Sequence, residues 1–294
     1  MARPLPRASV VVPTYGDWEA LAGCLACLGA QTVPAADFEI LVADNNPSAE
    51  PPAGLALPVN ARRVREPAPG SYAARNAAAV EAQGGILFFT DADCRPEPDW
   101  IAAGLAAFDA DPALGRAAGP VVLTATGADW TAPELYDRLF NLRQARYVAR
   151  GYAATANLAV RRSAFERVGA FDASLRSSGD KEWNGRAAAL DVPIAYVEAM
   201  RVRHPARASF EALAAKRARV AGGKTALRRR QGLRARLSLL RFALPSASAV
   251  RRILAEPGLT RAMRLDLLRL DWRLQRAEGA ARRGLLAGAE APRS

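Results

Sequence analysis

The chain has 294 residues, of which 50% are hydrophobic and 24% are charged, and its formal net charge is +12. This composition is typical of a folded protein with a sizeable core and excludes a disordered chain, and three cysteines are too few for a disulfide framework. A net positive charge is compatible with a nucleic-acid partner, so its distribution along the chain matters.

The positive charge is confined to the last third of the chain. Residues 200–294 contain 23 basic and six acidic residues, whereas residues 1–199 contain 18 basic and 23 acidic residues. Their net charges are therefore +17 and −5, which predicts two parts with different roles. The sequence has no apolar run of about 18 residues and no apolar segment near its start. We therefore expect neither a membrane span nor a signal peptide.

Strands and helices alternate from residue 9 to about residue 110. The predicted strands are 9–13, 38–43, 62–65 and 86–90, and the predicted helices are 17–30, 70–83 and 98–109. This alternation is typical of an α/β fold with a parallel sheet covered on both faces. Cys24 and Cys27 lie among Leu and Ala in the first helix, so we expect them in the core.

The second half of the chain is more mixed. Strands are predicted at 121–126, 154–160 and 194–197, helices at 133–150 and 180–190, and basic helices from residue 210 onward. Polar residues gather after the strands of the first half, where ligands of parallel sheets bind. They are Thr14, Tyr15, Asp44, Asp91 and Asp93.

Asp91 and Asp93 directly follow an apolar strand. Two carboxylates in this spacing can share one hard cation, or divide between a cation and a ribose hydroxyl. Mg²⁺ typically uses one or two carboxylates together with substrate phosphates. His204, the only histidine, also follows a predicted strand. A lone histidine is more often a packed or surface residue, but here it is placed to complete the cation's coordination or to contact a phosphate.

Asp180 follows Gly179 at the start of a predicted helix. An aspartate there can simply cap the helix, or it can be a general base that takes a proton from an acceptor hydroxyl. In the second case Glu182 and Trp183 would line the acceptor site. Upstream, Gly70 opens a helix whose N-terminus suits an anionic ligand. The sequence has no G-x-G-x-x-G segment, which argues against a dinucleotide-dependent dehydrogenase.

In this order, these segments resemble the family-2 glycosyltransferases of the GT-A fold. The matching stretches are Val10–Tyr15, the strand that ends at Asp44, Gly70–Ala77, Phe89–Asp93, Gly151–Leu158 and Gly179–Trp183. The resemblance implies a Rossmann-like, mixed but mostly parallel sheet with helices on both faces, followed by a basic helical extension. We expect a catalytic domain over 8–205, with a nucleotide-sugar half (8–125) and an acceptor half (126–205). The amphipathic extension would cover 206–294.

The resemblance also implies a role for each matching residue. The resemblance assigns donor binding to Pro13, Thr14, Tyr15, Asp44, Arg75, Asn76 and Asp91. It assigns metal binding to Asp93, Asp91 and His204. Asp180 would be the catalytic base, and Asn157, Glu182 and Trp183 would lie on the acceptor side. A Mn²⁺ or Mg²⁺ ion would neutralise charge on the leaving nucleoside diphosphate, and one displacement would invert the anomeric centre.

The sequence departs from the family pattern in two places. The family has a Glu before the base, where this chain has Gly179, so the acidic pair is incomplete. Processive members carry Q-x-x-R-W, whereas Gln231 and Arg234 stand here without the Trp. We therefore expect a non-processive enzyme that transfers one sugar to a glycan or lipid-linked acceptor. Cell-envelope polysaccharide or glycolipid synthesis would be its setting.

The basic extension is open to three interpretations. It can consist of helices packed on the catalytic domain, of amphipathic helices on an anionic membrane, or of a nucleic-acid surface. Its aromatic residues are too sparse for the last, so we expect no nucleic-acid partner. We place the protein in the cytoplasm, peripheral on the inner face of the cytoplasmic membrane. A nucleotidyltransferase and a non-catalytic membrane-associated carbohydrate-binding module remain as alternative functions.

Overall fold

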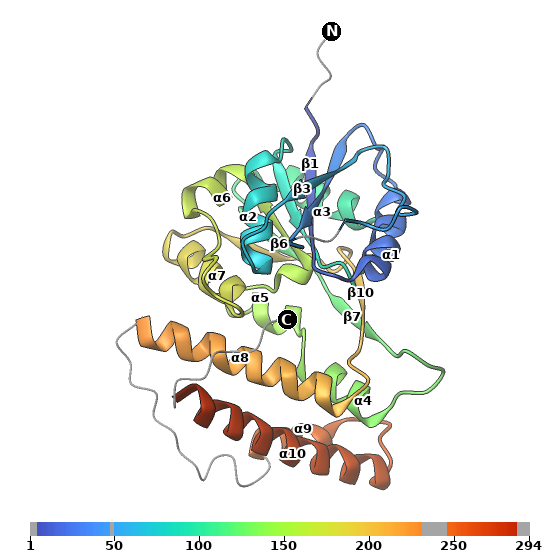
Figure 1. Ribbon diagram of the computed structural model, residues 1–294, viewed down its shortest axis with the longest axis vertical. Helices are drawn as coiled ribbons and strands as arrows, with labels where there is room; N and C mark the ends of the chain where they lie inside the picture. The colour runs from blue at the N-terminus through green and yellow to red at the C-terminus, as the bar shows by residue number, and fades with distance from the viewer. Residues whose placement is uncertain (1–4, 48–49, 231–245, 287–294) are drawn as a thin grey trace. The chain divides into compact units, whose positions relative to one another are not determined.

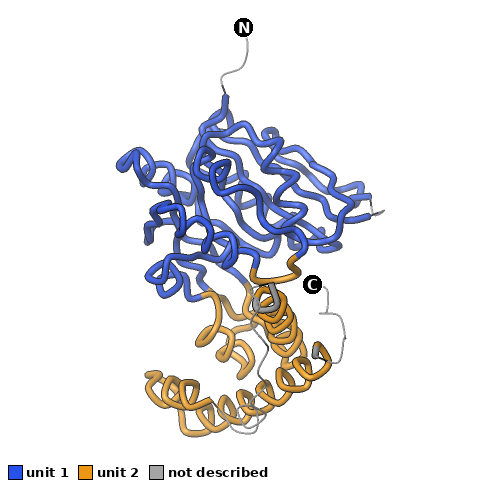
Figure 2. Tube along the Cα trace, turned by 90° about the vertical axis from the view of Figure 1, so that its left-hand side faces the viewer, with its two compact units in different colours: residues 1–122, 143–174, 179–204 blue, residues 123–142, 175–178, 205–294 orange. Residues whose placement is uncertain are grey.

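The computed structural model describes residues 5–47, 50–230 and 246–286, and Gln231 and Arg234 lie outside them. The chain forms two compact units, which Figure 2 shows in different colours. Unit 1 comprises residues 1–122, 143–174 and 179–204, and unit 2 comprises residues 123–142, 175–178 and 205–294.

Unit 1 is built on a seven-stranded sheet with the order β3-β2-β1-β4-β8-β6-β9. The strands are β1 (Ala8–Thr14), β2 (Phe38–Asp44), β3 (Ala61–Arg65), β4 (Ile86–Phe89), β6 (Arg116–Ala118), β8 (Leu158–Arg161) and β9 (Ile194–Tyr196). Only β8 runs antiparallel to its neighbours. The sheet is therefore mixed and mostly parallel, as predicted.

Helices cover this sheet on both faces. They are α1 (Trp18–Gly29), α2 (Ser71–Glu81), α3 (Trp100–Ala110), α5 (Gln144–Val148), α6 (Arg162–Val168) and α7 (Gly179–Ala189). Successive side chains of a strand point to opposite faces. Phe88 packs on Trp100 of α3, whereas Phe89 packs on Phe165 of α6 and on Phe171. Figure 1 accordingly shows α2, α6 and α7 on one side of β1 and α1 on the other.

Short strands extend the fold beside the main sheet. They are β5 (Arg95–Pro96), β7 (Val121–Thr124) and β10 (Val202–Pro205), in the order β5-β10-β7. β5 begins two residues after Asp93 and pairs antiparallel with β10, so that Arg203 lies opposite Arg95. This pairing brings the end of β10 to the segment that contains Asp91 and Asp93.

Three local predictions need correction. The helix predicted over 133–150 is two helices, α4 (Ala132–Phe140) and α5, because Asn141 is extended and Leu142 has a φ of 48°. The strand predicted from Ala154 begins only at Leu158, after a 3₁₀ turn over Thr155–Asn157. Cys24 is buried as expected, but Cys27 is partly exposed.

Unit 2 is a helical unit with its own hydrophobic core. It contains α4, α8 (Phe210–Arg230), α9 (Ala247–Ala255) and α10 (Arg261–Leu286). The core residues are Leu135, Tyr136, Leu139, Leu213, Ile253, Leu259, Leu267, Leu270 and Leu274. The basic helices thus pack on one another and on α4. Within the described part of the chain, no helix is both long and apolar enough to cross a membrane.

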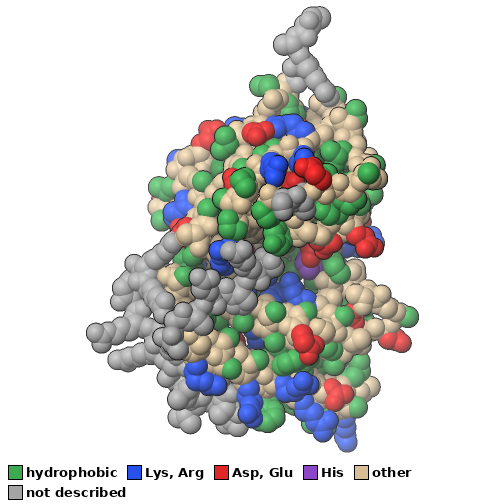
Figure 3. Space-filling model, in the orientation of Figure 1, with side chains coloured by type: hydrophobic (Ala, Val, Ile, Leu, Met, Phe, Trp, Pro, Cys, Tyr) green, Lys and Arg blue, Asp and Glu red, His purple; other side chains and the backbone are tan. Residues whose placement is uncertain are grey.

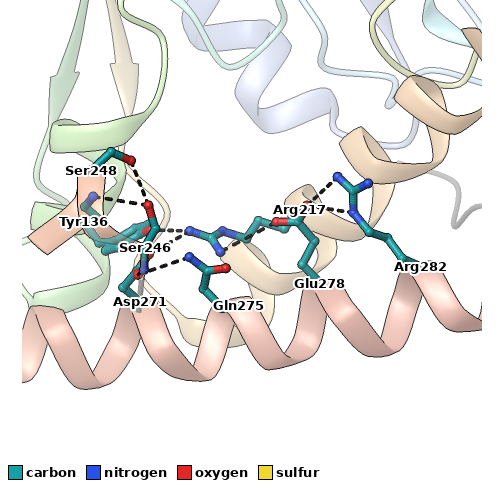
Figure 4. Close-up of polar contacts among 9 residues, drawn as sticks. Tyr136, Arg217, Ser246, Ser248, Asp271, Gln275, Glu278 and Arg282 are labelled. Atoms are coloured by element: carbon teal, nitrogen blue, oxygen red, sulfur yellow. Dashed lines mark hydrogen bonds and ion pairs between the residues drawn. The ribbon is translucent and has the colours of Figure 1, made fainter. Parts of the chain in front are cut away.

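A buried carboxylate joins the helices of unit 2. Asp271 of α10 is fully buried and accepts hydrogen bonds from the Tyr136 hydroxyl (2.6 Å), Arg217 Nη2 (3.1 Å) and the Ser246 amide (3.1 Å). Arg217 also pairs with Glu278 at 3.7 Å. Figure 4 shows this network between α4, α8 and α10. Part of the basic charge of the extension is therefore neutralised inside the helical unit.

Candidate active site

The carboxyl ends of β1 and β2 place two polar side chains next to each other, because Thr14 and Asp44 are partners in the parallel register. The Asp44 carboxylate is 1% exposed and accepts bonds from the Asn46 amide (3.0 Å) and Arg63 Nη1 (3.4 Å). The Thr14 hydroxyl is buried without a hydrogen-bond partner. An unsatisfied buried hydroxyl is costly, so its position at the strand end is compatible with a ligand that supplies the partner.

Asp91 lies beyond the end of β4, the other neighbour of β1 in the sheet, and forms an ion pair with Arg75 of α2. The Arg75 side chain is 4% exposed, whereas that of Asp91 is 34% exposed. A buried guanidinium needs a charged partner. Asp91 therefore neutralises Arg75 and fixes it at the N-terminal end of α2.

Asp93 lies next to His204, with 3.3 Å between Asp93 Oδ2 and His204 Nε2. The imidazole is 6% exposed and the Asp93 carboxylate is 39% exposed. In Figure 3 the purple histidine lies beside red acidic side chains. The pairing of β5 with β10 explains this proximity, which joins residues more than a hundred positions apart in the sequence.

The side chains at this point form a donor set that fits a divalent cation. Ligand atoms of Asp91, Asp93 and Cys94 lie within 4.8 Å of one another. Burial raises the pKa of the Cys94 thiol well above its usual range, and the thiol faces the Ala156 carbonyl at 3.7 Å. A protonated thiol is a poor ligand for a hard cation. This leaves two carboxylates and the nearby imidazole, a set compatible with Mn²⁺ or Mg²⁺.

Asp180 is at the second position of α7. Its carboxylate accepts a bond from the Lys181 amide at 2.8 Å and lies 3.4 Å from the Tyr72 hydroxyl. Burial raises the pKa of the Asp180 carboxyl above its usual range. A raised pKa makes a carboxylate a stronger base, which is what general-base catalysis requires.

One turn of α2 connects the aspartate pair with Asp180. Arg75 reaches Asp91, and Tyr72, three residues earlier, reaches Asp180. Residues at i and i+3 lie on the same face of a helix. The structure therefore brings the proposed donor side and the proposed base to the same place.

Four predicted site residues form contacts within the fold that the sequence did not indicate. Trp183 is fully buried, donates to the Gly169 carbonyl at 2.7 Å and packs on Phe165. Its indole offers no surface for stacking. Asn157 is also fully buried, and its amide bonds to Trp100 and to two main-chain carbonyls.

The other two of these residues are held at the edge of the site. Asn76 exchanges two hydrogen bonds with the main chain of Phe171, at 2.8 and 2.9 Å. Glu182 pairs with Arg186, one turn further along α7, at 2.7 Å. Asn76 therefore anchors the segment before α7, and Glu182 stabilises that helix.

Sequence reasoning missed Tyr72, Arg63 and a pair of tyrosines near Asp180. Tyr147 and Tyr152 are stacked with ring centroids 4.8 Å apart, and Lys181 Nζ lies 5.9 Å from the Tyr152 ring centroid. Burial raises the pKa of both tyrosines, and the nearby Asp180 charge contributes to each shift. Only the spacing of Tyr72 and Arg75, one helical turn, was visible in the sequence.

The strand-end carboxylates Asp44, Asp91 and Asp93 lie within a segment that sequence comparison assigns to a known family. Residues 9–169 match the family model described as glycosyl transferase family 2. The chain belongs to this family. A curated relative, glycosyltransferase AglE from Haloferax volcanii, is 32% identical over 231 residues, which is 76% of this chain and 75% of that protein. The protein is therefore a family-2 glycosyltransferase that uses a nucleotide-sugar, and the nucleotidyltransferase and non-catalytic alternatives are set aside.

Solved structures support the same fold. Mannosyltransferase PcManGT from Pyrobaculum calidifontis, in complex with GDP-Man and Mn²⁺, matches with a TM-score of 0.54 and 20% identity, over 97% of this chain and 77% of that one. TarS 1–349 from S. aureus, in complex with UDP-GlcNAc, matches with a TM-score of 0.54 and 16% identity, over 96% of this chain and 92% of that one. At these identities the likeness establishes the GT-A fold.

Proposed function

We propose that this glycosyltransferase is metal-dependent, inverting and non-processive. The observation that carries the proposal is the shared turn of α2, which contacts Asp91 through Arg75 and Asp180 through Tyr72. A donor diphosphate held near Asp91 and Asp93 would present its sugar toward Asp180. Asp180 would then take the proton of the acceptor hydroxyl as the new glycosidic bond forms and the bond to the diphosphate breaks.

The donor would lie across the carboxyl ends of β1, β2 and β4. Thr14, Asp44 and the exposed Tyr15 would contact the base and ribose, and Arg75 would hold Asp91 in place near the diphosphate. Asp93 and His204, with Asp91, would hold a divalent cation. When bound, this cation supplies positive charge to the leaving diphosphate. PcManGT was solved with GDP-Man and Mn²⁺, and TarS with UDP-GlcNAc, which supports a nucleoside diphosphate sugar with a cation in this fold.

The acceptor would lie against Tyr152 rather than Trp183. Tyr152 is half-buried, stacked on Tyr147 and close to Lys181. An aromatic face with a neighbouring cation suits the apolar face and the hydroxyls of a sugar ring. We propose a glycan or lipid-linked acceptor, used in cell-envelope polysaccharide or glycolipid synthesis.

We further propose that the outer face of α10 binds an anionic membrane surface. This face exposes Leu265 (48%) and Trp272 (38%) together with Arg261, Arg269, Arg273, Arg276 and Arg283. Figure 3 shows basic side chains along the helices at the bottom of the view. Arginines beside protruding Leu and Trp suit the interface of an anionic bilayer. This would keep the enzyme peripheral on the cytoplasmic membrane, near a lipid-linked acceptor.

The deciding experiment is a donor hydrolysis assay with a panel of UDP and GDP sugars, with Mn²⁺ or Mg²⁺ and with EDTA. We expect release of a free nucleoside diphosphate that EDTA abolishes, and at least about a hundredfold loss in Asp93→Ala. Asp109→Ala is the matched control, because Asp109 is an exposed aspartate of unit 1 paired with Arg7. Cation-dependent activity that survives Asp93→Ala would contradict the metal assignment. The anomeric configuration of the product, read by NMR, would separate inversion from retention.

A further inference from the structure

Gly179 directly precedes Asp180, the proposed base, and contact with another side chain explains the glycine. A Cβ at this position would lie 2.6 Å from Cε2, 2.8 Å from Cζ and 2.9 Å from Cδ2 of the Tyr72 ring. Real Cβ atoms essentially never come this close, so any side chain at 179 would displace the ring. Gly179 is the first residue of α7 and is not among the glycines with positive φ. The nearby tyrosine, rather than the backbone conformation, therefore requires the glycine.

The Tyr72 ring is held firmly in this position. It is 6% exposed, packs on Phe171 with centroids 5.7 Å apart, and has the Arg75 guanidinium 5.8 Å from its centroid. Phe171, Arg75 and Gly179 therefore surround the ring, so that its hydroxyl points in one direction. That hydroxyl accepts from the Asp180 amide at 3.1 Å and lies 3.4 Å from Asp180 Oδ1.

We propose that Tyr72 is the positioning residue of the catalytic base, and that residue 179 is a glycine because the Tyr72 ring lies against it. The phenol hydroxyl fixes the first turn of α7 through the Asp180 amide and orients the carboxylate toward the acceptor. Gly179 provides the space that the ring occupies. This inference rests on the proposed role of Asp180 as base and adds how the base is oriented.

The hydroxyl also affects the proton affinity of the base. Burial raises the pKa of Asp180, whereas the hydrogen bond from Tyr72 and the positive charge of Arg75 lower it. The negative charge of Asp91 also raises the pKa of Asp180, and the hydrogen bond from the Lys181 amide lowers it. Tyr147 and Tyr152 are nearby phenols on which the charge of Asp180 acts. Removing the Tyr72 hydroxyl should therefore raise the pKa of Asp180 further.

The test compares wild type with Tyr72→Phe, which keeps the packed ring. The readout is donor hydrolysis, in which water replaces the acceptor hydroxyl. We expect kcat to fall about tenfold, the size of one lost hydrogen bond, while the donor KM stays within about twofold. The acid limb of the kcat–pH profile should move to higher pH. An unchanged kcat and an unchanged acid limb would overturn the proposal.

A second pair of variants tests the contact itself. Gly179→Ala should lower kcat in the wild type, because its Cβ displaces the ring, and should have little further effect in a Tyr72→Ala background. Additive effects of the two substitutions would overturn the role of Gly179. Asp180→Asn separates this inference from the proposed function. If Asp180→Asn remains active, the base assignment is wrong; if it is inactive while Tyr72→Phe is normal, only the positioning role is wrong.

Discussion

At the scale of single residues, burial determines which polar side chains are available for chemistry. Asp180 and Asn157 both lie in the stretches that resemble the family, yet their surroundings differ. The side-chain amide of Asn157 forms hydrogen bonds to Trp100 and to two main-chain carbonyls in the core. The Asp180 carboxylate instead accepts one bond from a main-chain amide and lies next to one phenol. The sequence motif alone did not separate these two situations.

We predict that the pH dependence of the reaction reports the raised pKa of Asp180. The base acts in its deprotonated form, so kcat should fall as the pH drops through this pKa. Because burial raises that pKa, the acid limb should lie above the usual aspartate value of about 3.9. The measurement is kcat against pH at saturating donor. Asp180→Asn should remove the activity while donor-induced thermal stabilisation remains, and an acid limb below pH 4 would contradict the prediction.

Asn157 should be a structural residue. Asn157→Ala leaves Trp100 Nε1 and the carbonyls of Pro120 and Met200 without their buried partner. Each unsatisfied buried group costs about 1–3 kcal/mol, so the free energy of unfolding should fall by at least about 3 kcal/mol. Urea unfolding measures this loss. A stable variant with weakened acceptor use would instead restore the acceptor role that the sequence suggested.

At the scale of elements, the C-terminal helices are held together by a buried charge as well as by leucines. Asp271 has a fully buried carboxylate that three other segments of unit 2 approach, through Tyr136, Arg217 and Ser246. Gln275, one turn further along the same helix, also contacts it. Removing one partner of a buried pair leaves the other charge uncompensated.

Asp271→Asn should therefore lower the free energy of unfolding of unit 2 by about 3 kcal/mol, because Arg217 loses its buried partner. The same helix offers a matched control. Asp266 pairs with Arg269 at 3.4 Å on the surface, with both side chains more than half exposed, so Asp266→Asn should cost less than about 0.5 kcal/mol. Thermal unfolding of both variants gives the comparison, and equal losses would show that the network contributes no more than a surface pair.

At the scale of the whole molecule, charge separates the two parts of the chain. The mildly acidic first 199 residues contain the proposed site for an anionic donor, where a bound cation would offset the negative charges. In the basic part of the chain, residues 200–294, Arg217 pairs with Asp271 and Arg282 pairs with Glu278 inside unit 2. Other arginines of α10 are exposed. Among the arginines of this part that the structure describes, we expect the exposed ones to be available to a partner.

The exposed face of α10 should bind anionic vesicles. We expect the full chain to sediment with phosphatidylcholine vesicles that contain phosphatidylglycerol and much less with phosphatidylcholine alone. Changing Arg269, Arg273 and Arg276 together to Gln should lower binding at least about tenfold, since each basic residue contributes on the order of 1 kcal/mol near the surface. The same change at Arg7, Arg167 and Arg201, which are exposed in unit 1, is the control. Equal effects of the two triple variants would mean that net charge, and not this face, is responsible.

The family, most of the polar residues at the strand ends, and every strand and helix of the first 110 residues except β5 could be predicted from the sequence. These features depend on local patterns, namely apolar runs, turn residues and short motifs. The position of a motif along the chain shows which strand it follows. The helix break at Leu142 and the 3₁₀ turn before Leu158 were not predictable in this way, because tertiary contacts override local propensity there.

Which of these residues lie next to one another depends on the tertiary structure. His204 meets Asp93 because β5 pairs with β10, and Tyr72 meets Asp180 because α2 and α7 lie on the same face of the sheet. Trp183 is fully buried and therefore exposes no ring surface to an acceptor. Arg217 forms an ion pair with the buried Asp271. Contacts between distant segments depend on sheet order and packing, which no local pattern in the sequence encodes.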